Sequence, residues 1–553
     1  MARRKFRAAV VQTLAALGNL DFNINLLDKY AQEATRQGAE LVVFPECMNT
    51  GYLFDSQQHC SELAETITGK YVEAMADLCR KHGLFIASGF TEKDEVNEKI
   101  FNSGLLLDKT GKLILHYQKQ FLATHDQNWF ECGVKGSPVV DTELGRIGLL
   151  ICFDGRIPEI ARCLALQGTD IILDMANFFA MDQAEMWVPA RAFENESWII
   201  AATKAGVERS IYYPGGSMIV APTGQVAAKI PYDTHGVVSA DIAFSEELKT
   251  KLGNRRPDIY QRLLTPFEET PVAAFLKQPL IPEEETTKVA AVQCHRTDDP
   301  NSLDAAFEMV SHTAKLGVKL LALPLHFSSP MWNLNHQEAE DAAKDAEVHI
   351  NRAGEIARDY GCAIVLPVIE KIGDILSSSA TLIGPDGHVI GRYRQTHLSP
   401  SMQAWAKAGD ELPVFETPFG RIGIILGDDG LYPESTRILA LNGADIVVWC
   451  SAWVQPSERE LLAVPKAEDN RVYLVCVNRT DCPYPGGSFV VPPNGFPHWD
   501  VNISAPRTTR HGAVMPTYAN LALSRQKRMI PNVDMLRNRL IETYGPLVNT
   551  FIK

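Results

Sequence analysis

The chain has 553 residues, of which 46% are hydrophobic and 22% charged, and its formal net charge is −14. This length exceeds what one hydrophobic core ordinarily holds, so we expect several domains. The proportions of hydrophobic and charged residues are ordinary for a folded protein. The negative charge, with no basic stripe in the sequence, disfavours nucleic acid or an anionic membrane as a partner.

The cysteines and the N-terminus indicate the compartment. Eleven cysteines without a C-x-x-C pair predict neither a disulfide framework nor a zinc site. The basic start precedes the apolar run 8–11, which is too short for a signal peptide, and no apolar run reaches the roughly 18 residues that a membrane span needs. We therefore expect a cytoplasmic protein that has no membrane partner, metal or cofactor.

Helical and extended patterns alternate along the chain. Apolar residues at helical spacing precede Gly38 and Gly83, where C-cap glycines belong, and predict helices that end there. A further helix is expected at 184–196. Strands are expected at 6–12, 41–44, 84–88, 147–151, 171–173 and 198–203. This alternation predicts an α/β fold in which helices cover a sheet.

One cysteine lies where a strand turns into a helix. The apolar run 147–151 is typical of a buried strand, and apolar residues recur at helical spacing from residue 160 onward. Cys152, at the turn, would be held rigidly at the end of a sheet, close to backbone N–H groups that can stabilise an anion. A nucleophile needs both features. The alternative is a small buried side chain, a common role of free cysteine.

Two further residues favour the nucleophile. Glu46 follows a strand that stops at Pro45, and Lys119 follows another β-rich run. Together with the run 152–159, these stretches resemble the nitrilase superfamily of carbon–nitrogen hydrolases, in the family's order and at its usual separations. The family carries a second glutamate between its lysine and its cysteine, which falls here on Glu131.

The resemblance implies a four-layer α-β-β-α sandwich and a covalent mechanism. Glu46 would act as general base while Cys152 attacks a carbonyl carbon. Lys119 and the backbone N–H of Phe153 would hold the oxyanion, and Glu131 would orient Lys119 or the incoming water. Hydrolysis of the thioester would then release a carboxylic acid, or carbon dioxide and ammonia from a carbamoyl group.

The same resemblance suggests substrate contacts. In the family, the arginine four residues after the cysteine often meets a substrate carboxylate, and that residue is Arg156 here. The alternative is a structural pair with Asp154 or Glu159. Tyr52 and Asn177 match pocket-lining positions by placement alone.

The pattern then occurs a second time. Gln293 repeats Gln12, the Gly-Arg-Ile-Gly run at 420–423 repeats the one at 145–148, and Tyr-Pro-Gly-Gly-Ser occurs at both 213–217 and 484–488. We therefore expect a tandem duplication. Its parts are a catalytic domain over 1–267, an exposed Pro- and Glu-rich linker over 268–287, and a second nitrilase-like domain over 288–553.

The second copy lacks the reactive groups. Leu325 stands in the place of the base, Gln395 in the place of the lysine and Gly427 in the place of the cysteine, although the Pro-Glu pair after the turn is retained. We therefore interpret residues kept in both copies as structural and those present only once as chemical. We expect the second copy to cover an apolar face of the first as an intrachain pseudo-dimer, with or without further assembly into a homo-oligomer.

The predicted function is hydrolysis of a non-peptide C–N bond in a small amide or N-carbamoyl compound, with or without a carboxylate. Three alternatives remain. The first is a nitrilase, although the family's nitrilases usually carry Cys-Trp-Glu where this chain has Cys-Phe-Asp. The second is a glutaminase that feeds a synthetase, which is disfavoured because the rest of the chain repeats the same domain. The third is a binding or scaffold protein in which both copies are inert.

Overall fold

The computed structural model describes residues 5–244, 249–278, 286–294, 296–297, 299, 301–494, 503–504 and 512–550. The chain forms two compact units. Unit 1 comprises residues 1–254 with 530–533 and 538–553, and unit 2 comprises residues 255–529 with 534–537. The units therefore follow the two copies of the sequence except at the C-terminal end of each copy.

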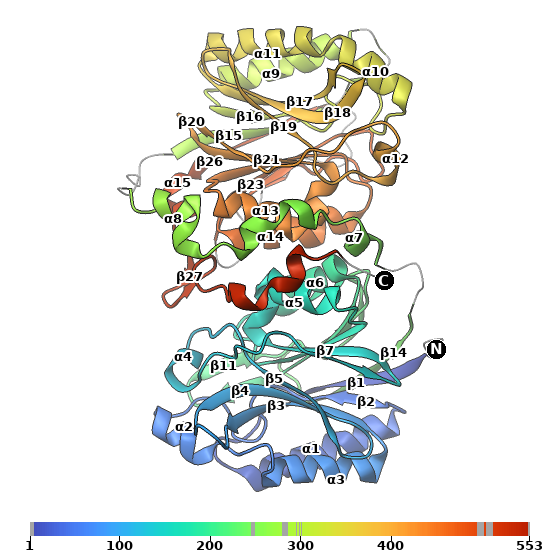
Figure 1. Ribbon diagram of the computed structural model, residues 1–553, viewed down its shortest axis with the longest axis vertical. Helices are drawn as coiled ribbons and strands as arrows, with labels where there is room; N and C mark the ends of the chain where they lie inside the picture. The colour runs from blue at the N-terminus through green and yellow to red at the C-terminus, as the bar shows by residue number, and fades with distance from the viewer. Residues whose placement is uncertain are drawn as a thin grey trace. The chain divides into compact units, whose positions relative to one another are not determined.

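Unit 1 has two layers of strands between two layers of helices (Figure 1). The first layer has the order β5-β4-β3-β2-β1-β14 and the second the order β13-β12-β9-β8-β7-β6, and a bridge between Gln12 and Thr203 joins them. The strands are β1 Phe6–Gln12, β2 Leu41–Val43, β3 Phe85–Lys93, β4 Ile100–Leu107, β5 Leu113–Gln118, β6 Val139–Thr142, β7 Gly145–Ile151, β8 Ile171–Ala176, β9 Trp198–Thr203, β12 Met218–Val220, β13 Val226–Lys229 and β14 Gly236–Ile242. A small hairpin, β10 Ala205–Glu208 and β11 Ile211–Pro214, follows β9.

The two-residue period of β1 explains the layers. Ala9 and Val11 pack against helices α1 (Leu20–Arg36) and α3 (Lys70–His82), whereas Ala8 and Val10 face the second layer of strands. Helices α5 (Pro158–Leu166) and α6 (Val188–Asn195) cover the far side of that second layer. Short helices α2 (Gln57–Leu63), α4 (Asp126–Trp129) and α7 (Thr250–Gly253) complete the unit. The expected α-β-β-α sandwich is confirmed.

The predicted helix ends agree with the structure, with one difference. Gly38 and Gly83 both have positive φ angles, 77° and 67°, where the helices end. The helix expected at 184–196 is divided into a π-helical turn, η2 Gln183–Trp187, and α6. Pro189 lies at the start of α6, where a missing N–H is tolerated.

Unit 2 repeats the sandwich. Its sheets have the orders β19-β18-β17-β16-β15-β26 and β20-β21-β22-β23-β24-β25. The strands are β15 Thr286–Gln293, β16 Leu320–Ala322, β17 Ala363–Ile372, β18 Ile375–Ile383, β19 Val389–Arg394, β20 Val414–Thr417, β21 Gly420–Leu426, β22 Ile446–Ser451, β23 Tyr473–Asn478, β24 Phe489–Val491, β25 Ile503–Ser504 and β26 Ala513–Asn520. The helices are α9 Ser302–Lys315, α10 His336–Lys344, α11 Ala346–Tyr360, α12 Pro400–Gln403, α13 Pro433–Leu441, α14 Ala463–Asn470 and α15 Leu521–Arg525. The duplication is confirmed.

The C-terminal segment of each copy belongs to the other unit. After residue 254 the chain forms short turns, η4 (Gln261–Leu264) and α8 (Pro271–Phe275), that pack against α13 of unit 2. Within unit 1, η10 (Gly545–Val548) packs against α5. The expected linker therefore contains a helix with buried side chains such as Val272, and its residues 279–285 lie outside the described part.

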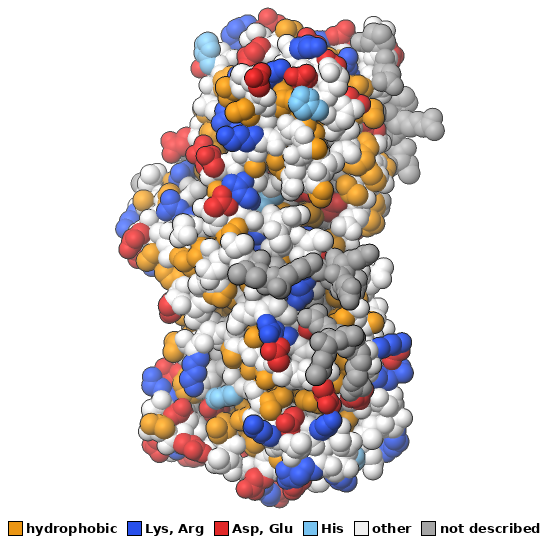
Figure 2. All heavy atoms as spheres, turned by 45° about the vertical axis from the view of Figure 1, so that its right-hand side comes forward, with side chains coloured by type: hydrophobic (Ala, Val, Ile, Leu, Met, Phe, Trp, Pro, Cys, Tyr) orange, Lys and Arg blue, Asp and Glu red, His pale blue; other side chains and the backbone are white. Residues whose placement is uncertain are grey.

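Charged side chains of both signs are interspersed on the face shown in Figure 2, and basic side chains do not gather into one patch there. Among the described residues, no helix combines the length and the apolar character that crossing a membrane requires.

Candidate active site

Cys152 occupies a strained turn at the end of β7. The strand ends at Ile151, a 3-10 turn (η1, Cys152–Arg156) follows, and α5 begins two residues later. Cys152 has a φ of 52°, a left-handed conformation that costs a non-glycine residue on the order of 1–3 kcal/mol. The matching residue in unit 2, Gly427, has a φ of 44°. The chain thus keeps a demanding backbone conformation in order to place a thiol there.

Side chains hold the peptide groups of the nucleophile. The N–H of Cys152 donates to Asp174 Oδ1 at 2.9 Å, and its carbonyl oxygen accepts from Gln183 Nε2. Asp154 accepts from the N–H of Ile151 at 3.1 Å and from the Tyr117 hydroxyl at 2.7 Å. Sequence reasoning missed Asp174 and Gln183, although a carboxylate inside the apolar strand β8 was a visible signal.

Glu46 is placed by a close packing of two strand ends. It is 1% exposed and follows β2, and a Cβ on Gly89 of β3 would lie 2.3 Å from its Cα, so only glycine fits beside it. Glu46 Oε1 accepts from Lys119 Nζ at 2.9 Å and from Asn102 Nδ2 at 2.6 Å. The carboxylate is therefore fixed within a buried polar cluster.

Lys119 bridges two buried carboxylates. Its ammonium lies 2.9 Å from Glu46 and 2.7 Å from Asp126 Oδ2, and Asp126 Oδ1 accepts from the Tyr52 hydroxyl at 2.8 Å. Tyr52 is therefore linked to Lys119 through Asp126. Glu131 does not reach this cluster, because its half-exposed carboxylate lies 3.8 Å from Lys99. The acid beside the lysine is Asp126, on α4, and this corrects the expectation for Glu131.

The electrostatics of the site keep the Cys152 thiol neutral and make the Glu46 carboxylate a suitable acceptor for its proton. Burial raises the pKa of the Cys152 thiol well above its usual range, and the charge of Glu46 raises it further. Burial also raises the pKa of Glu46, against the opposing effect of Lys119. Burial lowers the pKa of Lys119, but Asp126 and Glu46 outweigh it and raise that pKa well above normal. Lys119 therefore keeps its charge, and a raised pKa makes Glu46 a better proton acceptor.

The remaining expected residues surround this centre. The Arg156 guanidinium is buried, donates to Asp182 at 2.6 Å and lies 4.1 Å from the Trp187 ring. The structure thus gives Arg156 an internal carboxylate partner, Asp182, that the sequence did not indicate. The Phe153 ring stacks on Phe121 at 5.5 Å.

Asn177 lies directly beside the nucleophile. Cys152 Sγ is 3.8 Å from the Asn177 backbone oxygen, and the Asn177 side chain is fully buried.

Unit 2 preserves the turn without the chemistry. Asp429 accepts from Tyr393 at 2.6 Å and from the N–H of Leu426 at 3.0 Å, as Asp154 does in unit 1. A Cβ on Gly427 would lie 3.3 Å from both the Gln395 and the Leu325 side chains, so the three substituted positions do converge.

Two further acids of unit 1 are also replaced. Strand register puts Trp449 in the place of Asp174, and the indole donates to the Gly427 carbonyl at 3.0 Å. Met402 of α12 stands where Asp126 stands in α4. The whole acid–base cluster of unit 1 is therefore absent from unit 2.

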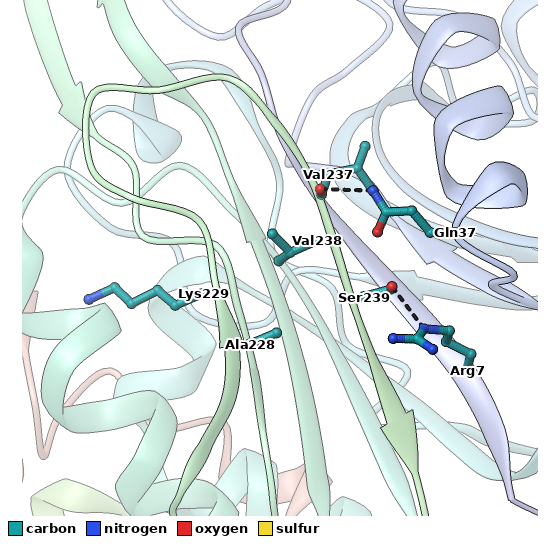
Figure 3. A pocket seen from close by; sticks show the side chains of 7 residues that line it. All are labelled: Arg7, Gln37, Ala228, Lys229, Val237, Val238 and Ser239. Carbon is teal, nitrogen blue, oxygen red and sulfur yellow. Dashed lines mark hydrogen bonds between the residues drawn. The ribbon is translucent and has the colours of Figure 1, made fainter.

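A surface hollow elsewhere in unit 1 is formed by β1, β13, β14 and the end of α1 (Figure 3). Arg7 donates to Ser239 at 3.0 Å and Gln37 donates to the Val237 carbonyl at 3.1 Å, so these polar groups bond to the surrounding protein. None of the candidate catalytic residues lines this hollow.

Both copies of the sequence match the same family of known proteins. The sequence matches the carbon-nitrogen hydrolase family over residues 7–251 and again over 288–497. It is similar to a nitrilase of Pyrococcus abyssi (35% identity over 221 residues, 40% of this chain and 83% of the relative). It is also similar to the deaminated glutathione amidase of Mus musculus (30% over 273 residues, 45% of this chain and 83% of the relative). A solved amidase from Nesterenkonia sp. has 24% identity and a TM-score of 0.42, over 47% of this chain and 97% of that one. The chain belongs to the carbon-nitrogen hydrolase family and carries the family's domain twice.

Proposed function

We propose that unit 1 hydrolyses the C–N bond of a small amide or N-carbamoyl compound through a thioester on Cys152, and that unit 2 carries out no chemistry. The observation that carries the proposal is the contrast between the copies. Unit 1 gathers Glu46, Lys119 and Asp126 around a buried thiol at a strained turn, whereas unit 2 keeps the same turn and lacks every reactive group. Catalysis explains why one copy retains buried charges that are costly to maintain.

The geometry supports a two-stage reaction. Glu46 takes the thiol proton as Cys152 Sγ attacks the carbonyl carbon, and the electron pair of the C=O bond moves to oxygen. The Lys119 ammonium and the Phe153 N–H stabilise this oxyanion. When the tetrahedral intermediate collapses, Glu46 gives its proton to the departing nitrogen and a thioester remains.

Water completes the cycle. Glu46 takes a proton from the water as the water's oxygen attacks the thioester carbon. Collapse then releases a carboxylic acid, or a carbamic acid that decomposes to carbon dioxide and ammonia, and the thiol regains its proton. In this proposal Asp126 replaces Glu131 as the residue that orients Lys119, and Asp174 with Gln183 holds the nucleophile.

The substrate class is tested by ammonia release from the full chain with a panel of primary amides, N-carbamoyl amines and nitriles. Release from amides or carbamoyl compounds, abolished in Cys152→Ala and retained in Cys132→Ala, supports the proposal. Cys132 is a matched control because it is also a free thiol of unit 1, carried outside the cluster. Turnover of nitriles alone would identify a nitrilase, and no turnover of any compound would favour a binding or scaffold protein.

We also propose that unit 1 depends on unit 2. The segment 538–553 comes from the second copy but belongs to unit 1, where Tyr544 and Leu547 are buried. An isolated fragment 1–267 therefore lacks part of its own unit. We expect this fragment to aggregate or lose activity and to recover when the rest of the chain is added in trans. A soluble, fully active fragment would show two independent domains.

A further inference from the structure

We propose that Asn177 and Tyr213 form a subsite for a second, uncharged polar group of the substrate. This inference rests on the proposed amide hydrolysis and specifies it. The preferred substrates are then short amides that carry another carboxamide, ureido or hydroxyl group, and acid-bearing amides are disfavoured.

The Asn177 side chain is the first observation. It is fully buried, and among the described residues neither its Nδ2 nor its Oδ1 has a hydrogen-bond partner. Native structures rarely leave a buried amide unpaired on both atoms. Because the Asn177 backbone oxygen already lies 3.8 Å from Cys152 Sγ, a ligand bonded to this amide would lie beside the nucleophile. Asn177 therefore carries an unpaired donor and an unpaired acceptor on a residue whose backbone lies against the nucleophile.

The Tyr213 hydroxyl is the second observation. Tyr213 lies on β11, is fully buried, and its hydroxyl also has no partner among the described residues. Lys204 Nζ lies 4.6 Å from the Tyr213 ring and 5.3 Å from the ring of Tyr52, which bonds to Asp126. Burial and then the charges of Glu208, Glu46 and Cys152 raise the Tyr213 pKa, so its hydroxyl keeps its proton and can donate.

The second copy provides an internal control. Its matching tyrosine, Tyr484, donates its hydroxyl to Glu460 at 2.8 Å. In unit 1 the corresponding Glu185 instead accepts a hydrogen bond from the Tyr232 hydroxyl at 2.9 Å, and the Tyr213 hydroxyl does not donate to it. Ala452 replaces Asn177 in the second copy. The two unpartnered polar groups thus occur together only in the copy that carries the thiol.

Charge decides between a neutral and an acidic substituent. Lys119 lies between Glu46 and Asp126, Lys204 pairs with Glu208 at 2.6 Å, and Arg156 pairs with Asp182 at 2.6 Å. A substrate carboxylate would meet cations that already have carboxylate partners, and it would add a negative charge to a buried acidic cluster. A neutral group that both donates and accepts satisfies Asn177 and Tyr213 without that cost.

The test compares three amides of similar size, namely succinamide, succinamic acid and butyramide, with the full chain. We expect kcat/KM for succinamide to exceed the other two by about tenfold or more, the factor typical of one well-placed hydrogen bond. Tyr213→Phe should raise KM for succinamide by about tenfold and leave butyramide unchanged. Tyr212→Phe, which removes the exposed hydroxyl that the neighbouring tyrosine of β11 donates to Asp233, is the matched control and should leave all three rates unchanged.

Binding to Cys152→Ala separates this inference from the proposed function. Calorimetry should show that succinamide binds more tightly than butyramide and that the difference disappears when Tyr213→Phe is added. Preference for succinamic acid, or an equal loss on all three amides in Tyr213→Phe, would overturn the subsite while leaving amide hydrolysis intact. Absence of turnover together with selective succinamide binding would overturn the proposed function but retain the subsite, and absence of both would reject both.

Discussion

Replacing Lys119 by glutamine should destabilise unit 1 as well as inactivate it. The ammonium lies 2.9 Å from Glu46 and 2.7 Å from Asp126, and all three side chains are 1% exposed. Removing one partner of a buried ion pair costs about 3–5 kcal/mol, because a buried charge is left uncompensated. The lost oxyanion donor should also lower kcat by about 100- to 1000-fold.

The second copy suggests a compensated variant. Gln395 takes the place of the lysine there, and Leu325 and Met402 take the places of Glu46 and Asp126, so no carboxylate is left without a cation. The triple variant Glu46→Leu/Lys119→Gln/Asp126→Met should therefore be more stable than Lys119→Gln alone, although both are inactive. Hydrogen exchange of β2 and β5 reports on unit 1 separately from unit 2 and measures the difference.

The stability of Lys119→Gln should also depend on pH. Burial raises the pKa of Glu46, and loss of the lysine removes the group that lowers it. The folded state then binds protons more tightly than the unfolded state, so stability falls as the pH rises through the usual carboxyl range, about 4 to 5, and beyond. The deficit relative to wild type should shrink as the pH falls from 7 towards 5. A single variant as stable as wild type at pH 7, or a triple variant less stable than the single one, would refute this reasoning.

Three further predictions concern the residues around Lys119 and Cys152 and the C-terminal segment of unit 1. Asp126→Asn should lower kcat by about 100-fold because it removes the negative charge beside Lys119. Glu131→Gln changes an exposed residue and should leave kcat within about twofold of the wild-type value, and steady-state kinetics of both variants checks the difference. Asp174→Leu should cost about 1–3 kcal/mol by leaving the Cys152 N–H unpaired, whereas Asp174→Asn keeps an acceptor and should cost less, as chemical denaturation of both variants will show. Leu547→Ala should cost about 2–5 kcal/mol and be detected by hydrogen exchange in α5, with exchange in α13 unchanged as the control.

The sequence predicted the parts of the fold that depend on local pattern. Strand periodicity, C-cap glycines and the repeated motifs placed the sheets and revealed the duplication. The exchange of C-terminal segments was not predictable, because the turns at 261–264 and 545–548 are short and their burial against α13 and α5 arises from tertiary packing. Composition alone suggested an exposed linker over 268–287, the range that contains α8 and its buried Val272.

At the site, motif residues were easier to predict than their partners. Glu46, Lys119 and Cys152 stand at strand ends with recognisable flanks, and the structure brings Glu46 and Lys119 into contact. Asp126 was missed because it occurs on a short helix without a motif, and Glu131, five residues later, was chosen instead. A hydrogen bond such as that from Cys152 to Asp174 depends on the register of β7 and β8, which sequence spacing does not give.

The most direct test of the central claim is the intact mass of the full chain, quenched in acid during turnover of a slow amide substrate. The account predicts one acyl group per chain, located by peptide mapping at Cys152 and absent from Cys152→Ala. An acyl group on Cys47 or Cys132, or continued ammonia release by Cys152→Ala, would contradict it.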